Sequence, residues 1–326
     1  MGVVLSIIIP VYNSKKHLDE CLKSICTSSK RSFEVIMVDD GSNDGSTEIC
    51  IDYCAKDNRF RLLRKRNGGA SSARNYGMKK ASGQNIMFVD SDDVLLEGWD
   101  KIMDSLVEYD IYYYCNNIKK DIDRKILLSY ITGANEDSIC LSAPFSKVFS
   151  SSFLKKNHLE FNEKLINGED MLFNVSAILA ANTFTIINYQ FYLYRQETGQ
   201  ATRRFDERII ESDRVFHKEL HDVFSEMNYD KKVAYEIERY CLVNAIALIL
   251  NRLSFADTYS AAKNYYLELE KEPYREIIDF GEFSHSKIVS YLCKKHKYEE
   301  LYRMFRIRNH LIIFVKKMLK KKYNRI

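Results

Sequence analysis

Residues 33–42 read FEVIMVDDGS, an apolar run that ends in two aspartates and a glycine. A nearly continuous apolar run of this length is typical of a strand buried on both faces of a parallel sheet. Similar runs occur at 5–12, 60–66 and 84–90, and stretches with helical spacing of apolar residues separate them. This alternation predicts an α/β fold, a mostly parallel sheet covered by helices on both faces.

The pattern changes twice along the remaining chain. Residues 110–117 and 183–195 are aromatic and β-branched and predict strands, whereas 168–182 predicts a helix. Beyond about residue 205 the apolar residues recur almost entirely at helical spacing. We therefore expect a first domain at 1–204 and a mainly helical C-terminal region at 205–326.

Charge is concentrated at the C-terminal end. The chain has a net charge of +4, and residues 302–326 carry nine Lys/Arg and no acid, which leaves 4 − 9 = −5 for residues 1–301. A nucleic-acid-binding surface spread over the protein is therefore excluded. The tail predicts either a helix that lies on an anionic membrane or a final helix packed on the domain with a solvated basic face.

The eight cysteines contain no CxxC pair, which favours reduced thiols in a cytosolic protein over a zinc site or a secreted disulfide framework. The first residues lack the basic region of a signal peptide, and no apolar run reaches the ~18–20 residues that span a bilayer. We expect a cytoplasmic protein, which the first interpretation of the tail would make peripheral at the inner face of the cell membrane.

Acidic clusters follow two of the predicted strands. Asp39 and Asp40 follow one, and Asp90, Asp92 and Asp93 follow another. Because ligands of parallel sheets bind at the carboxyl ends of the strands, both clusters should face the same site. The first can accept hydrogen bonds from a base or ribose, or cap the next helix. The second suits Mg²⁺ or Mn²⁺ that bridges a diphosphate, or forms a solvated turn.

Two further motifs carry candidate chemistry. The stretch KRNGGASSARNYG at 65–77 places Arg74 behind a glycine pair at a helix start, which suits phosphate contacts but fits neither a dinucleotide fingerprint nor a Walker loop. Glu169 and Asp170 begin a predicted helix, where ordinary N-terminal acids explain them as well as a general base does. The histidines of HKELH at 217–221 favour a solvated helix face over zinc.

The order of these motifs resembles the family 2 glycosyltransferases of GT-A fold. The resemblance covers about residues 3–200 and rests on SIIIPVYN, FEVIMVDDGSNDGS, NGGASSARNYGMKKASG, IMFVDSDD and NGEDMLF. It implies an enzyme that takes a sugar from a nucleotide-sugar, a UDP-sugar above all, in the synthesis of capsule or other bacterial surface polysaccharides.

The resemblance also implies roles for single residues. The nucleotide-sugar-binding residues would be Pro10, Tyr12, Asp39, Asp40, Arg74, Asp90 and Ser91. Mn²⁺ or Mg²⁺ would be held by Asp92 or Asp93. Asp170, beside Glu169, would be the general base of an inverting displacement, taking the proton of the acceptor hydroxyl.

Acceptor residues are implied by position, at Trp99, Tyr194 and Arg195. The Q/RxxRW motif and membrane helices of the processive synthases are absent, which favours addition of one sugar per acceptor. We expect a glycan or lipid-linked glycan acceptor, and we also consider a homo-oligomer.

Two other functions are weighed against this one. A sugar-phosphate nucleotidyltransferase usually has a glycine-rich basic loop after the first strand, which PVYNSKK is not. A non-catalytic partner subunit would retain the fold without needing the acids at 39–40, 90–93 and 169–170. Both are therefore disfavoured.

Overall fold

The computed structural model describes residues 2–28, 32–116, 122–133, 139–195, 205–280 and 286–323. The chain divides into two units, one of residues 1–196 with 222–233, and the other of 197–221 with 234–326. The predicted domain boundary after residue 204 adjoins residues 196–204, which lie outside the described residues.

The first unit is built on one sheet of seven strands in the order β3-β2-β1-β4-β7-β6-β8. Their bounds are β1 Leu5–Val11, β2 Phe33–Asp39, β3 Phe60–Arg64, β4 Asn85–Phe88, β6 Ile111–Tyr114, β7 Lys147–Ser150 and β8 Phe184–Ile187. Strands β1 to β4 are parallel, β7 runs antiparallel between β4 and β6, and β6 and β8 are parallel. The predicted α/β class with a mostly parallel sheet is confirmed.

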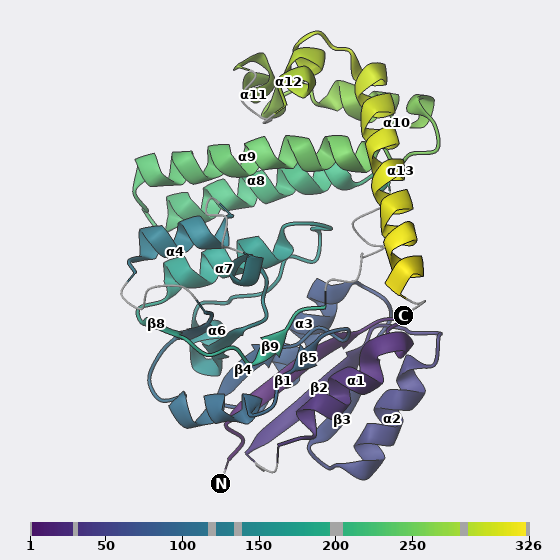
Figure 1. Ribbon diagram of the computed structural model, residues 1–326. Coiled ribbons are helices and arrows are strands. Elements are labelled where there is room, and N and C mark those ends of the chain that lie inside the picture. Colours follow the sequence, from purple (N-terminus) through teal and green to yellow (C-terminus); the bar gives the residue numbers. More distant parts are fainter. Residues whose placement is uncertain are drawn as a thin grey trace. The chain divides into compact units, whose positions relative to one another are not determined.

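Helices cover both faces of the parallel strands, as the alternation of apolar residues in β2 requires. Val35 and Met37 belong to one core cluster with α1 (Lys15–Ile25) and α2 (Ser46–Lys56). Ile36 and Val38 point to the opposite face, where α3 (Ala70–Lys80) packs through Ala73. Figure 1 shows these three helices around the sheet.

Helix α3 lies unusually close to the sheet because its contact residue is a glycine. A Cβ atom on Gly77 would stand 2.5 Å from Ile8 Cγ2 and 3.3 Å from Val38 Cγ2. This close packing sets the distance between α3 and β1. Arg74 lies on the preceding turn of the same helix.

The second half of the unit supplies α4 (Arg124–Ile131), α5 (Ile139–Ser142), α6 (Ser151–Lys156) and α7 (Glu169–Ala180), a 3₁₀ helix η1 (Trp99–Ser105) and a small sheet of β5 (Val94–Leu95) and β9 (Tyr192–Leu193). The predicted helix at 168–182 and strands at 110–117 and 183–195 are confirmed as α7, β6, β8 and β9. Strand β7 was not expected from the sequence.

An aromatic cluster holds α7 on the sheet. Phe173 of α7 stacks on Phe161 at 4.0 Å between ring centroids and meets Phe149 of β7 and Phe88 of β4 edge-on. Such pairs add about 0.5–1.5 kcal/mol each beyond the burial of their area. The start of α7 is thereby held beside the carboxyl end of β4.

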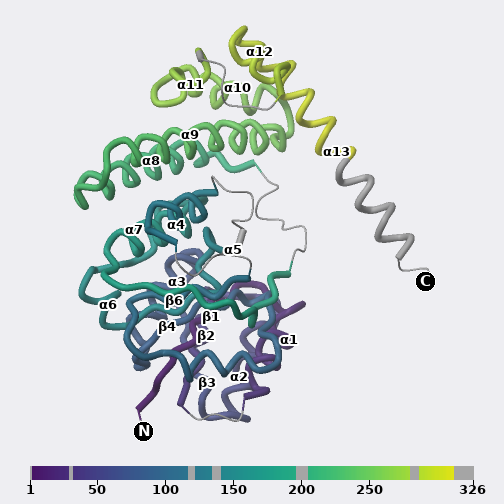
Figure 2. Tube along the Cα trace, turned by 60° about the vertical axis from the view of Figure 1, so that its left-hand side comes forward, coloured from purple at the N-terminus to yellow at the C-terminus, as the bar shows by residue number. Residues whose placement is uncertain are grey.

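The second unit is helical, as predicted. Its helices are α10 (Tyr259–Glu268), α11 (Tyr274–Phe280), α12 (Lys287–Lys294), α13 (Tyr298–Tyr323) and most of α8 (Ile209–Glu226) and α9 (Lys231–Leu253), whose residues 222–226 and 231–233 belong to the first unit. Helices α8 and α9 lie side by side (Figures 1 and 2), and His221 of α8 contacts Glu238 of α9 at 3.1 Å. His217 contacts Asp213 at 3.4 Å, so each histidine of the HKELH motif meets an acid.

The first part of the basic tail packs on this unit. Leu301, Tyr302 and Phe305 of α13 are buried, and the Tyr302 hydroxyl donates to the Ala256 carbonyl at 2.8 Å. The side chains of 312–326 lie outside the described residues, so membrane contact by the tail stays a prediction. Among the described helices, none combines the length and apolarity needed to cross a membrane.

Candidate active site

Hydrogen bonds join the loops that follow β1, β2 and β4. Asn13 Oδ1 accepts from the Asn43 amide at 2.9 Å, and the Asn13 amide donates to Ser42 Oγ at 3.1 Å. The hydroxyls of Ser14 and Ser91 lie 2.6 Å apart. The carboxyl ends of three parallel strands therefore form one edge, as the sequence predicted.

Asp39 is fully buried and holds the loop after β2. Its carboxylate accepts from the Ser42 amide at 2.9 Å and from Thr47 Oγ1 at 2.7 Å, with Arg64 Nε at 3.4 Å. Burial alone would raise the pKa of Asp39, but these hydrogen bonds and Arg64 hold it below its usual value. The carboxylate is thus ionised and used inside the fold.

Asp40 is also buried and fixes the loop in front of α3. It accepts from the amides of Gly68 at 3.0 Å and Gly69 at 2.7 Å, and pairs with Lys65 Nζ at 2.7 Å. Gly69 has φ +90°, a conformation that other residues rarely adopt. The contacts of Asp39 and Asp40 show that both carboxylates hold loops in place. Their nucleotide-binding role stays a prediction.

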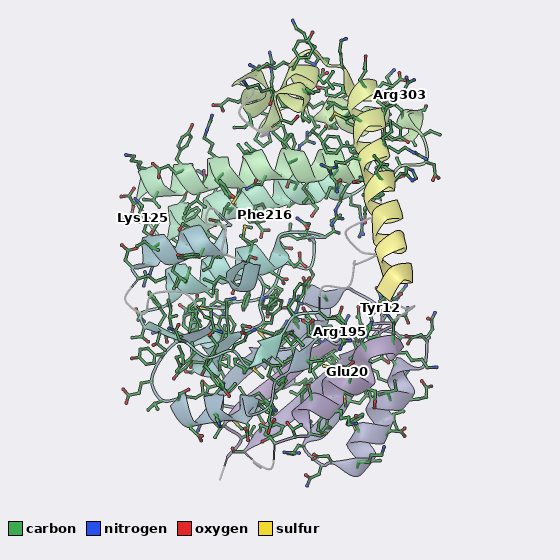
Figure 3. All side chains as sticks on the ribbon, in the orientation of Figure 1. Tyr12, Glu20, Lys125, Arg195, Phe216 and Arg303 are labelled. Atoms are coloured by element: carbon green, nitrogen blue, oxygen red, sulfur yellow. The ribbon has the colours of Figure 1, made fainter. Side chains whose placement is uncertain are left out.

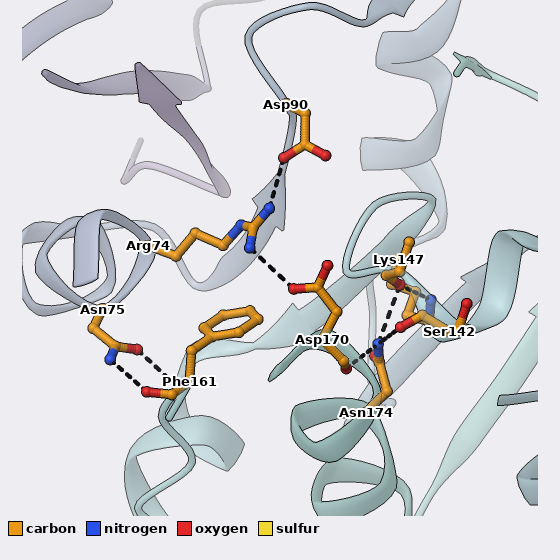
Figure 4. A network of polar contacts seen from close by, with 9 residues as sticks. Arg74, Asn75, Asp90, Ser142, Lys147, Phe161, Asp170 and Asn174 are labelled. Carbon is orange, nitrogen blue, oxygen red and sulfur yellow. Dashed lines mark hydrogen bonds and ion pairs between the residues drawn. The ribbon is translucent and has the colours of Figure 1, made fainter. Parts of the chain in front are cut away.

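The central feature of the site is Arg74, which bridges two carboxylates that are 80 residues apart (170 − 90) in the chain (Figure 4). Arg74 Nη2 donates to Asp90 Oδ1 at 2.7 Å, and Nη1 donates to Asp170 Oδ1 at 3.0 Å. Arg74 is 4% exposed. Three residues predicted separately from the sequence therefore meet at one point.

The guanidinium of Arg74 packs against the ring of Phe161. Its Cζ lies 5.3 Å from the centroid of the Phe161 ring, close enough for a cation–π contact. Asn75, the next residue, donates to the Phe161 carbonyl and accepts from its amide, both at 2.8 Å. Arg74 Nε is buried and has no hydrogen-bond partner among the described residues.

Asp170 has the electrostatics of a proton acceptor. Burial raises its pKa to about 7, Arg74 opposes the rise, and the carboxylates of Glu169 and Asp90 add to it. Its side chain keeps 30% exposure. A carboxylate that titrates near neutral pH and stays accessible is suited to general base catalysis.

Asp92 and Asp93 have different surroundings. Asp93 is fully buried and accepts from the Tyr192 hydroxyl at 2.6 Å and the Arg195 amide at 2.8 Å. Asp92 is exposed, and its backbone carbonyl accepts from Arg195 Nε at 2.9 Å. Asp93 therefore ties the loop to the segment after β9, whereas the Asp92 carboxylate is open to a ligand.

A divalent cation fits this arrangement only in part. Within the described ranges, no three histidine, cysteine, aspartate or glutamate side chains converge on a metal site. An exposed aspartate is nevertheless a suitable ligand for Mg²⁺ or Mn²⁺, which bind through one or two carboxylates and take their other ligands from substrate phosphates and water. Of the two predicted ligands, Asp92 fits this role better than Asp93.

The remaining predicted residues are the nucleotide-binding candidates Pro10 and Tyr12 and the acceptor candidates Tyr194 and Arg195. Tyr12 is 53% exposed at the end of β1, next to the half-buried Pro10 segment. Arg195 pairs with Glu20 of α1 at 2.8 Å (Figure 3), and Tyr194, 47% exposed, stacks on Phe145. These positions leave nucleotide-binding and acceptor roles open.

The structure contradicts an acceptor role for Trp99. Its side chain is 0% exposed and packs edge-on against Phe33 at 5.2 Å. The 3₁₀ helix that begins at Trp99 turns the indole into the core, so it cannot contact an acceptor.

Sequence reasoning missed three residues that support the site. Tyr192 donates to Asp93 and accepts from the Asp90 amide at 3.1 Å. Lys147 and Asn174 are fully buried near the start of α7. The only signal in the sequence is one lysine inside the apolar stretch PFSKVF.

The chain is similar to known glycosyltransferases in sequence and fold. Residues 6–128 match the family model described as Glycosyl transferase family 2. The chain is 28% identical over 303 residues to the glycosyltransferase GlyG of Streptococcus pneumoniae serotype 4, covering 85% of this chain and 94% of that protein. It is 29% identical over 294 residues to the poly(ribitol-phosphate) beta-N-acetylglucosaminyltransferase TarS of Staphylococcus aureus, 84% of this chain and 48% of that relative's length.

Two solved structures share the fold. The S. aureus TarS 1–349 complex with UDP-GlcNAc aligns with a TM-score of 0.57 at 23% identity, covering 95% of this chain and 92% of that chain. The mannosyltransferase PcManGT from Pyrobaculum calidifontis, in complex with GDP-Man and Mn²⁺, aligns with a TM-score of 0.50 at 14% identity, covering 94% and 88%.

Proposed function

We propose that this chain, whose residues 6–128 match the Glycosyl transferase family 2 model and whose fold resembles that of TarS, moves one sugar from a UDP-sugar to a glycan acceptor of the bacterial cell surface. The observation that carries the proposal is the bridge from Asp90 through Arg74 to Asp170. The bridge supports the proposal because it joins Asp170, the base in this proposal, to the edge of the sheet where the acids of the predicted donor site lie.

The proposed reaction is a single displacement with inversion. An acceptor hydroxyl oxygen bonds to the anomeric carbon as the bond from that carbon to the diphosphate oxygen breaks. Asp170 takes the hydroxyl proton, and the nucleoside diphosphate leaves with the bonding electron pair. Arg74 holds Asp170 in place and keeps a positive charge beside the reacting groups.

A divalent cation would be held by Asp92, with the diphosphate and water as its other ligands. When bound, it supplies positive charge to the departing diphosphate. The exposed Asp92 carboxylate supports this proposal, as does the Mn²⁺ named in the PcManGT complex.

The choice of substrates rests on the relatives. TarS forms a complex with UDP-GlcNAc, and its name identifies poly(ribitol-phosphate) as its acceptor. We infer a UDP-sugar donor. As the acceptor we infer a surface glycan or a polyol-phosphate polymer, and we expect this acceptor to be linked to a lipid.

The deciding experiment measures nucleoside diphosphate release from a panel of nucleotide-sugars, with poly(ribitol-phosphate) and lipid-linked glycans as acceptors. We expect release with one UDP-sugar that depends on the acceptor, and its loss in Asp170→Asn. Release of pyrophosphate from a nucleotide and a sugar phosphate would instead identify a nucleotidyltransferase. Absence of any turnover, with nucleotide-sugar bound, would identify a non-catalytic partner.

Membrane association of the tail is a separate proposal. Residues 312–326 carry six basic residues, Lys316, Lys317, Lys320, Lys321, Lys322 and Arg325, and no acid. Each contributes about 1 kcal/mol at an anionic surface. Deleting 312–326, which spares the packed residues 301–309, should abolish sedimentation with phosphatidylserine vesicles. Undiminished sedimentation would refute the proposal.

A further inference from the structure

A lysine is buried beneath the start of α7. Lys147, the first residue of β7, is 0% exposed, and its ammonium donates to the carbonyls of Ala143 at 2.5 Å and Phe145 at 3.5 Å. It also lies over the Tyr113 ring, 5.7 Å from the centroid. Removing an ammonium group from water costs several kcal/mol, so its neighbours must compensate for that cost.

Asn174 joins the same carbonyl to α7. It is fully buried, one turn after Asp170, and its Nδ2 lies 2.9 Å from the Ser142 carbonyl, 3.1 Å from that of Ala143 and 2.9 Å from that of Asp170. Three carbonyl oxygens around one atom identify it as the amide nitrogen. The Ala143 carbonyl thus accepts from both Lys147 and Asn174 (Figure 4).

These contacts form a continuous connection from the sheet to the proposed base. It runs from Lys147 of β7 through the Ala143 carbonyl to Asn174, and from Asn174 to the backbone of Asp170. Because β7 lies between β4 and β6 in the sheet, these contacts tie the first turn of α7 to an interior strand.

The connection also carries charge. The charged groups that act on Asp170 are Arg74 from α3, Asp90 after β4, Glu169 of α7 and Lys147 of β7. Arg74 divides its two ion pairs between Asp90 and Asp170. Lys147 therefore supplies a second positive charge that favours the ionised form of Asp170.

We propose that Lys147 is a positioning residue for Asp170: through Ala143 and Asn174 it fixes the first turn of α7, and its charge keeps the Asp170 carboxylate ready to take a proton. The proposal rests on the proposed role of Asp170 as the base.

The test compares kcat and KM of the full-length protein from pH 5.5 to 9.5 for the wild type, Lys147→Met and Lys156→Met. Methionine is unbranched and only one heavy atom shorter than lysine, and it removes the charge; Lys156 is an exposed lysine of the neighbouring α6. For Lys147→Met we expect a fall in kcat of about tenfold at pH 7, and an acidic limb of kcat moved to higher pH, because Lys147 lowers the pKa of Asp170. The donor KM and the Lys156→Met profile should stay as in the wild type.

A second variant separates position from charge. Asn174→Ala breaks the connection and leaves the lysine, so kcat should fall about tenfold with the acidic limb unmoved; it also serves if Lys147→Met does not fold. An unshifted limb in folded Lys147→Met, or wild-type kcat in Asn174→Ala, would overturn the proposal. An active Asp170→Asn, by contrast, would refute the proposed base itself.

Discussion

The two acidic strand ends look alike in sequence but differ in what their carboxylates do. Asp39 and Asp40, after β2, are buried and use both oxygens on amides, a hydroxyl and a lysine of their own loops. After β4, Asp90 shares one arginine with Asp170, and Asp92 is exposed. Saturation by internal hydrogen bonds, rather than the presence of acids, separates carboxylates that hold loops from carboxylates open to substrate.

The largest effect should come from Asp170 of α7, which shares Arg74 with Asp90 after β4. Asp170→Asn removes the proposed proton acceptor, so we expect kcat to fall on the order of 10³-fold with little change in thermal stability. Nucleoside diphosphate release and a thermal melt measure the two effects, with Glu97→Gln, an exposed acid, as the control. A variant that keeps more than a tenth of wild-type kcat would place the base elsewhere.

Removing the exposed acid should cost less. We expect Asp92→Asn to lower kcat/KM by about 10²-fold, since the amide binds a divalent cation weakly, and to raise the Mn²⁺ concentration needed for half-maximal rate. Titration of Mn²⁺ into protein stripped with EDTA gives both values. Glu97→Gln, an exposed acid seven residues after Asp90, is the matched control. Equal losses in both variants would remove the specific role of Asp92.

Substitution of Asp39, the last residue of β2, should lower stability rather than activity. Asp39→Ala leaves the Ser42 amide and the Thr47 hydroxyl without their acceptor, so we expect the free energy of unfolding to fall by about 2–3 kcal/mol. Because folding lowers the pKa of Asp39, its contribution is full above about pH 4 and is lost at lower pH. Urea unfolding at pH 7 and pH 3 tests both statements. A raised donor KM with unchanged stability would instead make Asp39 a nucleotide contact.

The smallest effect is the dependence of rate on pH. With the pKa of Asp170 at about 7, only the ionised form accepts a proton, so kcat should fall about tenfold per unit below pH 7 and level off above it. The wild-type profile shows this acidic limb if Asp170 is the base. A rate that is flat between pH 5.5 and 8 would contradict it.

The sequence predicted the parts of the fold that depend on local periodicity. Strands β1 to β4 and helices α1 to α3 follow from apolar runs and spacing within each segment. Strand β7 could not be predicted in this way, because its four residues become a strand only by pairing with β4 and β6.

The site was predictable in its residue types and less so in its contacts. Arg74, Asp90 and Asp170 were identified from separate motifs, and their meeting follows from the common edge of parallel strands. The burial of Asp93 and Trp99 depends on how the chain turns after β4, through Tyr192 and the 3₁₀ helix. Periodicity contains no information on such a turn.

The antiparallel insertion of β7 has a consequence for the order in which the molecule assembles. Its pairing joins Asn85 to Ser150 across 65 residues (150 − 85), whereas β1 and β2 join Leu5 to Phe33 across 28 (33 − 5). Longer loops close more slowly, so we expect β1, β2 and β3, which pair across 25–28 residues, to form first and α7, with Asp170, to dock last. Pulse-labelled hydrogen exchange during refolding should protect the Ile36 amide before that of Val175. A ribosome-bound chain that has not yet exposed residue 150 would have the loops after β1, β2 and β4 but would still lack Asp170, the proposed base.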